Sequence, residues 1–417
     1  MAITRTEYTS GLNFFGNVSP AELLGAFGSP LYIYNENILR ERCREMKNLV
    51  TLPGFTACYS TKANGNPHLL RIILEEGLIA DAMSPGELAL LQRAGFKKES
   101  ICYVCNNVSS EELVLAANQS SYVSVDSLSQ LESFGSLMPG TQVMLRVNPG
   151  IGAGHHDKVV TAGKKTKFGV VPGDFPAMRS ILERHGLTLV GLNQHVGSLF
   201  MDAGAFLDAA KWLLDTAADF PGIQVVDFGG GFGVPYNKYK GEARLDLDEL
   251  SERFTLLLEN WIEETGFEGR FIIEPGRYVT AECGLLLGTA HAVKNNGPTR
   301  FVGTDIGFNI LARPIMYDSF HDVEVYTKEN EPRTGMMQTI VGNICESGDV
   351  LAKDRVLPEI KTGDHLGILD AGAYCFAMSS NYNQRLRPAE VLIRADGSPR
   401  QIRHRDTAET LLAAYPQ

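Results

Sequence analysis

Chemically active residue types follow apolar runs at regular intervals in the middle of the chain. Lys62 follows the apolar run Phe55–Tyr59, where partial loss of hydration would lower the pKa of its amine and make it a nucleophile for carbonyls. A solvated lysine at the end of a strand is the ordinary alternative. Comparable residues follow five later runs: Asp81 and Ser84, Arg146 and Asn148, His195 and Ser198, Gly229–Gly231, and Glu274 with Arg277.

Two of these positions suit a phosphorylated, ring-bearing ligand. The backbone amides of Gly229–Gly231 and of Gly276 and Arg277 could surround a phosphate, although a glycine run alone also suits a flexible turn. The Glu274 carboxylate could pair with a protonated ring nitrogen, or instead form a buried ion pair with Arg277. A flat imidazole such as His195 could stack on the same ring, although a histidine satisfied within the core is more common.

A second set of reactive residues lies toward the C-terminus. Cys345 to Asp349 places a thiol and two carboxylates, one of them Glu346, in a single polar turn. An unreactive cysteine is normally buried among apolar groups, so this setting is unusual. Arg313 with Tyr317, and Asp370 to Tyr374, add a guanidinium and phenols. Turn formation or surface exposure is the alternative for each of these groups.

Eight strand-like runs alternate with helical patterns between residues 55 and 276. Such alternation indicates parallel strands joined by right-handed crossovers, and eight strands can close a (β/α)8 barrel. A doubly wound open sheet is the alternative. The runs are Phe55–Tyr59, Ile79–Met83, Ile101–Val104, Tyr122–Val125, Gln142–Val147, Thr188–Gln194, Ile223–Phe228 and Phe271–Ile273, and the helical patterns are Pro85–Gly95, Ser110–Asn118, Ala203–Asp219 and Leu247–Thr265.

The pattern changes after about residue 282, where short strand-like runs alternate with turns that contain glycine and proline. This texture predicts an antiparallel β domain. We therefore expect a barrel over residues 36–281, and a β domain made from residues 1–35 and 282–417. The strand-like runs are Arg300–Thr304, Asp322–Tyr326, Met337–Val341, His365–Leu369 and Glu390–Arg394.

Composition excludes several classes of function. The 417 residues carry a net charge of −11, which argues against a nucleic-acid binder. The seven cysteines suit free thiols in a reducing compartment, and the absence of a signal pattern or long apolar run predicts a cytoplasmic protein. No residue cluster predicts a metal site, since the adjacent His155 and His156 would point apart.

In order along the chain, these motifs resemble those of the alanine-racemase-type barrel decarboxylases that use pyridoxal 5'-phosphate. Each motif is modest, but together they cover nearly the whole chain. They are Tyr59–Asn64, Ser84–Leu88, Arg146–Pro149, Lys167–Gly169, His195–Ser198, Gly229–Gly231, Glu274–Arg277, Cys345–Lys353, Asp370–Tyr374 and Arg387–Glu390.

The resemblance implies a homodimer with active sites shared between subunits. It implies that Lys62 holds the cofactor covalently, that His195 faces its ring, and that Cys345 from the other subunit returns a proton to the substrate. The catalytic set is thus Lys62, Cys345 and His195. The cofactor-binding set is Lys62, Asp81, His195, Ser198, Gly230, Gly231, Glu274, Gly276, Arg277 and Tyr374. The substrate-binding set is Arg277, Arg313, Tyr317, Glu346 and Tyr374.

The resemblance also implies a reaction, the decarboxylation of meso-2,6-diaminopimelate to L-lysine and CO2. Arg313 could bind the distal carboxylate of that substrate in a bidentate manner, and Glu346 its distal ammonium. A substrate without the distal carboxylate, such as ornithine or lysine, would leave a buried arginine unpaired. The alternatives are decarboxylation of ornithine, lysine or carboxynorspermidine, a racemase, and a non-catalytic cofactor-binding protein.

Overall fold

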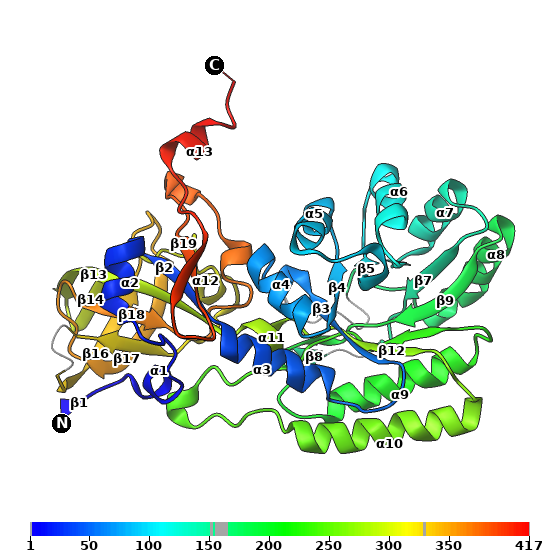
Figure 1. The fold of residues 1–417 in the computed structure, drawn as a ribbon, viewed down its shortest axis with the longest axis horizontal. Helices are drawn as coiled ribbons and strands as arrows, with labels where there is room; N and C mark the ends of the chain where they lie inside the picture. The colour runs from blue at the N-terminus through cyan, green and yellow to red at the C-terminus, as the bar shows by residue number, and fades with distance from the viewer. Residues whose placement is uncertain (1, 151–152, 155–165, 328–330, 417) are drawn as a thin grey trace. The chain divides into compact units, whose positions relative to one another are not determined.

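The computed structural model describes residues 2–150, 153–154, 166–327 and 331–416. His155 and His156 lie outside the described residues. The chain forms two compact units, labelled by element in Figure 1. The barrel unit comprises Arg40–Val234 and Ala243–Val279, and the β unit comprises Met1–Leu39, Pro235–Glu242 and Thr280–Gln417.

The barrel unit is built on eight parallel strands that close on themselves, which confirms the predicted barrel and excludes the open sheet. Around the barrel the order is β11, β12, β3, β4, β5, β6, β7, β9. The strands are β3 (Phe55–Ser60), β4 (Ile79–Ala82), β5 (Ile101–Val104), β6 (Tyr122–Val125), β7 (Gln142–Arg146), β9 (Thr188–Asn193), β11 (Val225–Asp227) and β12 (Arg270–Ile273).

Helices cover the outside of the barrel, and α4 to α8 pack side by side in chain order, as do α9 and α10 (Figure 1). The sequence patterns between residues 55 and 276 predicted four of them, α5, α6, α9 and α10. They missed α4, whose adjacent apolar residues resemble a strand, and α7, which is rich in serine. The helices are α3 (Glu36–Lys47), α4 (Pro67–Glu75), α5 (Pro85–Ala94), α6 (Ser110–Gln119), α7 (Leu128–Leu137), α8 (Phe175–His185), α9 (Gly204–Ala218), α10 (Leu247–Thr265) and the short α11 (Arg277–Thr280).

Capping explains why helices of modest propensity form directly after the strands. Ser84, Ser109 and Ser127 each accept a hydrogen bond from the backbone amide three residues later, at the start of α5, α6 and α7. Such caps satisfy amides that have no partner within the helix. The strand ends are therefore held in place by the helices that follow them.

The β unit contains a mixed sheet rather than a purely antiparallel one, because β14 pairs with β16 and β19 with β2 in parallel. Hairpins impose antiparallel pairing only on consecutive strands, whereas these pairs join strands that are distant in the chain. Its elements are β1 (Ala2–Ile3), α1 (Glu7–Gly11), α2 (Pro20–Phe27), β2 (Leu31–Asn35), β13 (Gly284–Asn296), β14 (Thr299–Thr304), α12 (Arg313–Tyr317), β15 (Val323–Tyr326), β16 (Arg333–Val341), β17 (Val350–Pro358), β18 (His365–Ile368), β19 (Ala389–Ile393), β20 (Pro399–Arg403) and α13 (Ala408–Leu412).

The segment Pro235–Glu242 belongs to the β unit although it continues the loop that follows β11. Lys238 binds Asp370 at 2.8 Å and lies 3.4 Å from Glu282, and both carboxylates are fully buried. The Tyr239 hydroxyl donates to Glu324 at 2.6 Å. These buried bonds fix the segment firmly in the β unit.

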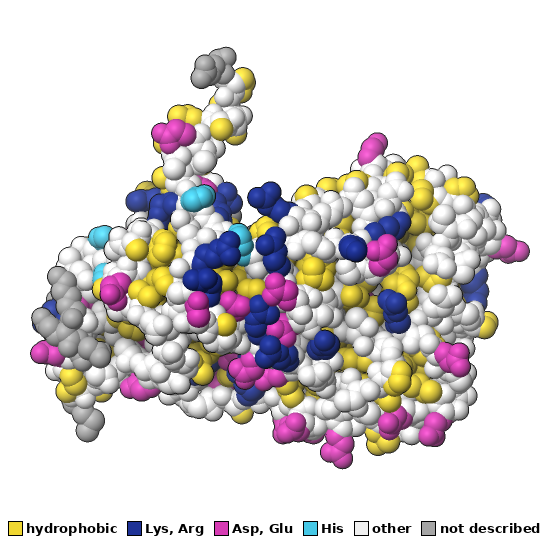
Figure 2. Space-filling view, viewed as in Figure 1, with side chains coloured by type: hydrophobic (Ala, Val, Ile, Leu, Met, Phe, Trp, Pro, Cys, Tyr) yellow, Lys and Arg dark blue, Asp and Glu magenta, His cyan; other side chains and the backbone are white. Residues whose placement is uncertain are grey.

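Charges of both signs are interspersed on the face shown in Figure 2. In the barrel unit, Arg40 pairs with Glu75 and Glu76, and Arg44 with Glu76. Within the described residues, no helix combines the length and apolar character needed to span a bilayer.

Candidate functional site

Lys62 lies in a short 3-10 turn directly after β3, and Asp81 at the end of the neighbouring β4 organises this turn. Asp81 accepts hydrogen bonds from the Ser60 hydroxyl at 2.9 Å and from the Thr61 amide at 3.1 Å. The Lys62 amine is 3.9 Å from the same carboxylate. The barrel therefore places an amine and a carboxylate side by side where two strands end.

Glu274, at the end of β12, is only 4% exposed, and its Oε1 atom has no hydrogen-bond partner among the residues that the structure describes. Burial, and next the negative charge of Asp81, raises its pKa to about 7. Burial also raises the pKa of Asp227, at the end of β11, well above its usual range. A buried carboxylate oxygen without a partner is costly, so Glu274 is suited to receive a donor from a ligand.

His195, in the loop after β9, is neutral and has a defined tautomer. The Gly230 amide donates to its Nδ1 atom at 3.1 Å, so a neutral imidazole carries its proton on Nε2. Loss of hydration, and next the positive charges of Lys62 and Arg146, lower the pKa of His195 well below its ordinary value.

The glycine run is packed backbone against backbone. A Cβ atom on Gly229 would collide with the Gln194 carbonyl, and one on Gly230 with the Glu274 carbonyl. The Gly229 amide donates to Asp227 at 2.9 Å, while the Gly230 amide is used by His195. Two of the three glycine amides thus have partners within the chain, so Gly230 supports the imidazole instead of serving as a free phosphate donor.

We expect Gly230→Ala to destabilise the fold by about 2–4 kcal/mol, because the new methyl group would force the loops after β11 and β12 apart. The midpoint of denaturant unfolding measures the change. Gly173→Ala is the matched control, since nothing lies within 4 Å of the Cβ it would carry. Equal midpoints for the two variants would contradict this packing.

We expect the free energy of unfolding of the cofactor-free protein to fall as the pH rises from about 4.5 to 7, partly through Glu274. Its raised pKa, about 7, means that the folded state keeps a proton which the unfolded chain has already released. Glu274→Gln cannot titrate and should show a shallower decline, whereas the exposed Glu259→Gln should match the unmodified protein. Urea unfolding across this pH range measures the slopes; parallel slopes for Glu274→Gln and the unmodified protein would refute the effect.

Arg277 and Ser198 complete the barrel mouth. Arg277 is only 6% exposed, and its Nη2 atom donates to the Ser198 hydroxyl at 2.9 Å. Arg277 begins α11, directly after the buried Gly276. The barrel unit thereby joins Lys62, Asp81, His195, Ser198, Gly230, Gly231, Glu274, Gly276 and Arg277 at the ends of its strands.

The remaining predicted site residues lie in the β unit. Of the seven cysteines, all within the described residues, only Cys345 is exposed. Its turn is held by Asp349, which accepts the amide hydrogens of Phe308 at 2.7 Å and of Ile344 at 2.8 Å. Next to Cys345, the Glu346 carboxylate accepts a hydrogen bond from the Tyr382 hydroxyl at 2.8 Å. An exposed thiol and a carboxylate are thus presented side by side on one well-anchored turn.

Arg313 begins α12 and is only 2% exposed. It donates to His321 Nε2 at 2.8 Å, and no carboxylate of the described residues forms an ion pair with it. Tyr317 ends the same helix, while Tyr374 has a left-handed backbone with φ of 57°. Sequence reasoning missed His321, the hydrogen-bond partner of Arg313, although a histidine close to Arg313 in the sequence was a usable signal.

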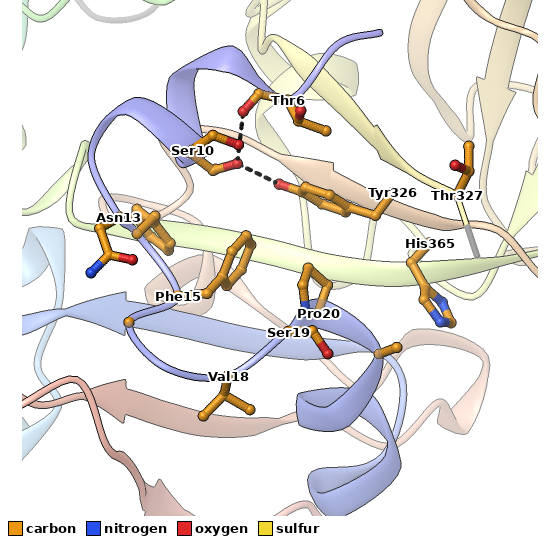
Figure 3. Close-up of a pocket in the computed structure, with 14 residues that line it drawn as sticks. Thr6, Ser10, Asn13, Phe15, Val18, Ser19, Pro20, Tyr326, Thr327 and His365 are labelled. Atoms are coloured by element: carbon orange, nitrogen blue, oxygen red, sulfur yellow. Dashed lines mark hydrogen bonds between the residues drawn. The ribbon is translucent and has the colours of Figure 1, made fainter. Parts of the chain in front are cut away.

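A separate cavity of about 450 Å3 lies within the β unit, between the α1–α2 segment and β15 (Figure 3). Figure 3 shows Phe15 and Tyr326 beside it, with ring centroids 5.5 Å apart. The other lining groups include hydroxyls and His365. None of the predicted site residues lines this cavity. No cluster of three or more metal-ligating side chains occurs among the residues described.

The closed barrel, with polar site residues at the ends of its strands, is the part of the chain that identifies the protein family. The chain belongs to the pyridoxal-dependent decarboxylases, whose pyridoxal binding domain matches residues 36–281. This match spans every barrel strand and each predicted site residue of the barrel unit. The cofactor of this family is pyridoxal phosphate.

Within this class, the chain is similar to several diaminopimelate decarboxylases. The enzyme of Methanothermobacter thermautotrophicus is 40% identical over 95% of this chain and 94% of its own length. A crystal structure of diaminopimelate decarboxylase covers 94% of this chain and 95% of its own, with 33% identity and a TM-score of 0.88. The Helicobacter pylori enzyme complexed with L-lysine covers 95% of this chain and 99% of its own, with 28% identity and a TM-score of 0.87.

Proposed function

We propose that this protein decarboxylates meso-2,6-diaminopimelate to L-lysine and CO2 with pyridoxal 5'-phosphate. One observation of the structure carries the substrate assignment. Arg313 is a buried guanidinium for which the described residues supply no carboxylate. Since an uncompensated buried charge is costly, Arg313 is suited to a substrate that brings its own carboxylate at the end remote from the reaction.

The barrel mouth fits the cofactor. The Glu274 Oε1 atom is buried, no described residue bonds to it, and it suits a ring nitrogen that carries a proton. The Lys62 amine at the end of β3 suits covalent attachment of an aldehyde, and the neutral His195 suits a flat ring. Ser198, Gly231, Gly276, Arg277 and, from the β unit, Tyr374 would hold the phosphate. When bound, pyridoxal phosphate supplies the electron sink for the carbanion that remains after CO2 leaves.

The protein's own residues position the substrate and move its protons. Lys62 would hold the cofactor, and its amine would assist exchange with the substrate amine and release of the product. Glu274 would keep the ring nitrogen protonated, and the Cys345 thiol would supply the proton for the substrate carbon. Arg277, Arg313, Tyr317, Glu346 and Tyr374 bind the substrate. In this scheme Glu346 takes the distal ammonium and Arg313 the distal carboxylate.

The test is CO2 release from a panel of amino acids with and without added pyridoxal phosphate. We expect cofactor-dependent release from meso-2,6-diaminopimelate that is faster than release from lysine, ornithine or carboxynorspermidine. Faster turnover of lysine or ornithine would overturn the substrate assignment. A visible cofactor band without CO2 release from any substrate would favour a non-catalytic cofactor-binding protein.

We further propose a cytoplasmic homodimer in which Cys345 of one subunit acts in the site that contains Lys62 of the other. Lys62→Ala and Cys345→Ala should each be nearly inactive alone. Co-expressed, they should regain about one quarter of the unmodified activity, because half of the dimers are mixed and each has one intact site. No recovery in co-purified mixed dimers would rule out shared sites.

A further inference from the structure

Arg313 is held by a histidine where a carboxylate would be usual. Its Nη1 atom donates to His321 Nε2 at 2.8 Å, and its Nη2 atom lies 3.4 Å from the Ser319 hydroxyl. His321 is only 1% exposed. Both partners are neutral oxygen or nitrogen acceptors, so they fix the guanidinium without offsetting its charge.

The hydrogen bonds determine the protonation state of His321. Its Nδ1 atom lies 2.7 Å from the Leu369 carbonyl, which can only accept, so Nδ1 carries the proton. Arginine can only donate, so Nε2 must present its lone pair to Arg313. Both ring nitrogens of His321 therefore have hydrogen-bond partners. Only the neutral imidazole with its proton on Nδ1 can make both hydrogen bonds.

A tyrosine completes this arrangement from a different part of the chain. The Tyr236 ring lies 4.5 Å from the Arg313 guanidinium carbon, and 5.2 Å from the His321 ring at 78°. Tyr236 lies in Pro235–Glu242, the segment that Lys238 anchors to Asp370. The aromatic face stabilises a cation without neutralising it.

We propose that His321 and Tyr236 are positioning residues that determine specificity, because they orient Arg313 while preserving its positive charge for a distal carboxylate. This inference rests on the proposed function. It requires a neutral acceptor at position 321: an acidic residue would pair with Arg313 and occupy the place of the substrate carboxylate, while an apolar residue would release the guanidinium.

Three variants of the holoenzyme test these requirements. His321→Gln keeps a neutral acceptor, and the KM for diaminopimelate should stay within about three-fold of the unmodified value. His321→Leu and His321→Glu should each raise the KM by about 10- to 100-fold with little change in kcat. Gln and Glu have the same size, so their contrast isolates charge even if the leucine variant does not fold. His365→Leu, in the same unit, is the control and should match the unmodified enzyme.

Inhibitor binding distinguishes a loss of Arg313 orientation from a non-specific disturbance of the active site. L-lysine retains one amino-acid head after decarboxylation and therefore a carboxylate for Arg313, whereas cadaverine has none. The calorimetric Kd of L-lysine should rise in His321→Glu by the same factor as the KM, while that of cadaverine should stay unchanged. Equal KM values for the Gln and Glu variants, or equal weakening of both ligands, would overturn the proposal. Absence of CO2 release by the unmodified enzyme would instead refute the proposed function itself.

Discussion

Lys62→Ala is expected to lower kcat with diaminopimelate by about 10⁴-fold or more, and to abolish the visible absorption of the bound cofactor. Lys62 leaves β3 next to Asp81, with its amine 3.9 Å from that carboxylate. In its proposed role the Lys62 amine both attaches the cofactor and helps to release the product, so its loss should stop both steps.

Two further variants show whether the amine or only its charge matters. Lys62→Arg keeps a positive charge beside Asp81 but cannot attack an aldehyde, so it should be as inactive as the alanine variant. Lys211→Ala, on the exposed face of α9, should retain full activity and absorption. Activity of Lys62→Arg within ten-fold of the unmodified enzyme would exclude the covalent role. Steady-state kinetics and absorption spectra provide the measurements.

Arg313→Ala is expected to raise the KM for diaminopimelate by about 10²–10³-fold, comparable with the roughly 3–4 kcal/mol lost when one partner of a buried charge pair is removed. Arg313 is 2% exposed and donates to His321 at 2.8 Å, so its guanidinium is buried and held in a fixed position. Turnover of lysine, which as a substrate has no distal carboxylate, should change far less. Selectivity for diaminopimelate should therefore fall by nearly the same factor as the KM rises.

The exposed Arg400→Ala, in the same unit, controls for the loss of one positive charge and should leave the KM unchanged. Arg313→Lys keeps the charge but loses the planar fork, and should lie between the unmodified enzyme and the alanine variant. Initial rates over a range of substrate concentrations measure each case. An unaltered KM in Arg313→Ala would show that the distal carboxylate binds elsewhere.

Much of the barrel was predictable because the sequence patterns that indicate its strands and helices are local. Each of the eight predicted strands overlaps an observed strand, and β5, β6 and α10 have the predicted boundaries. Apolar runs alternate with amphipathic helices, and Ser84, Ser109 and Ser127 cap three of these helices. Both features depend only on residues that are neighbours in the sequence. The same reasoning missed α4, α7 and α8, in which contiguous apolar residues or many serines obscure the helical period.

Long-range pairing in the β unit was less predictable. Strand β2 comes from the start of the chain and β19 from near its end, yet they pair in parallel. No turn between them constrains their direction, so only packing of the whole unit selects it. The assignment of Pro235–Glu242 to this unit likewise depends on buried bonds from Lys238 and Tyr239 to residues far along the chain.

The sequence by itself determined the chemistry: an amine, an imidazole, a glycine run, a carboxylate, a thiol and a guanidinium, most of them directly after strands or in tight turns. Residue type and local spacing carry that information. Only the tertiary structure decided which donors and acceptors these groups use. The Gly230 amide donates a hydrogen bond to His195. Arg313 donates to His321 and lies over the Tyr236 ring. Hydrogen-bond partners are chosen by distance in space, which separation along the chain does not encode.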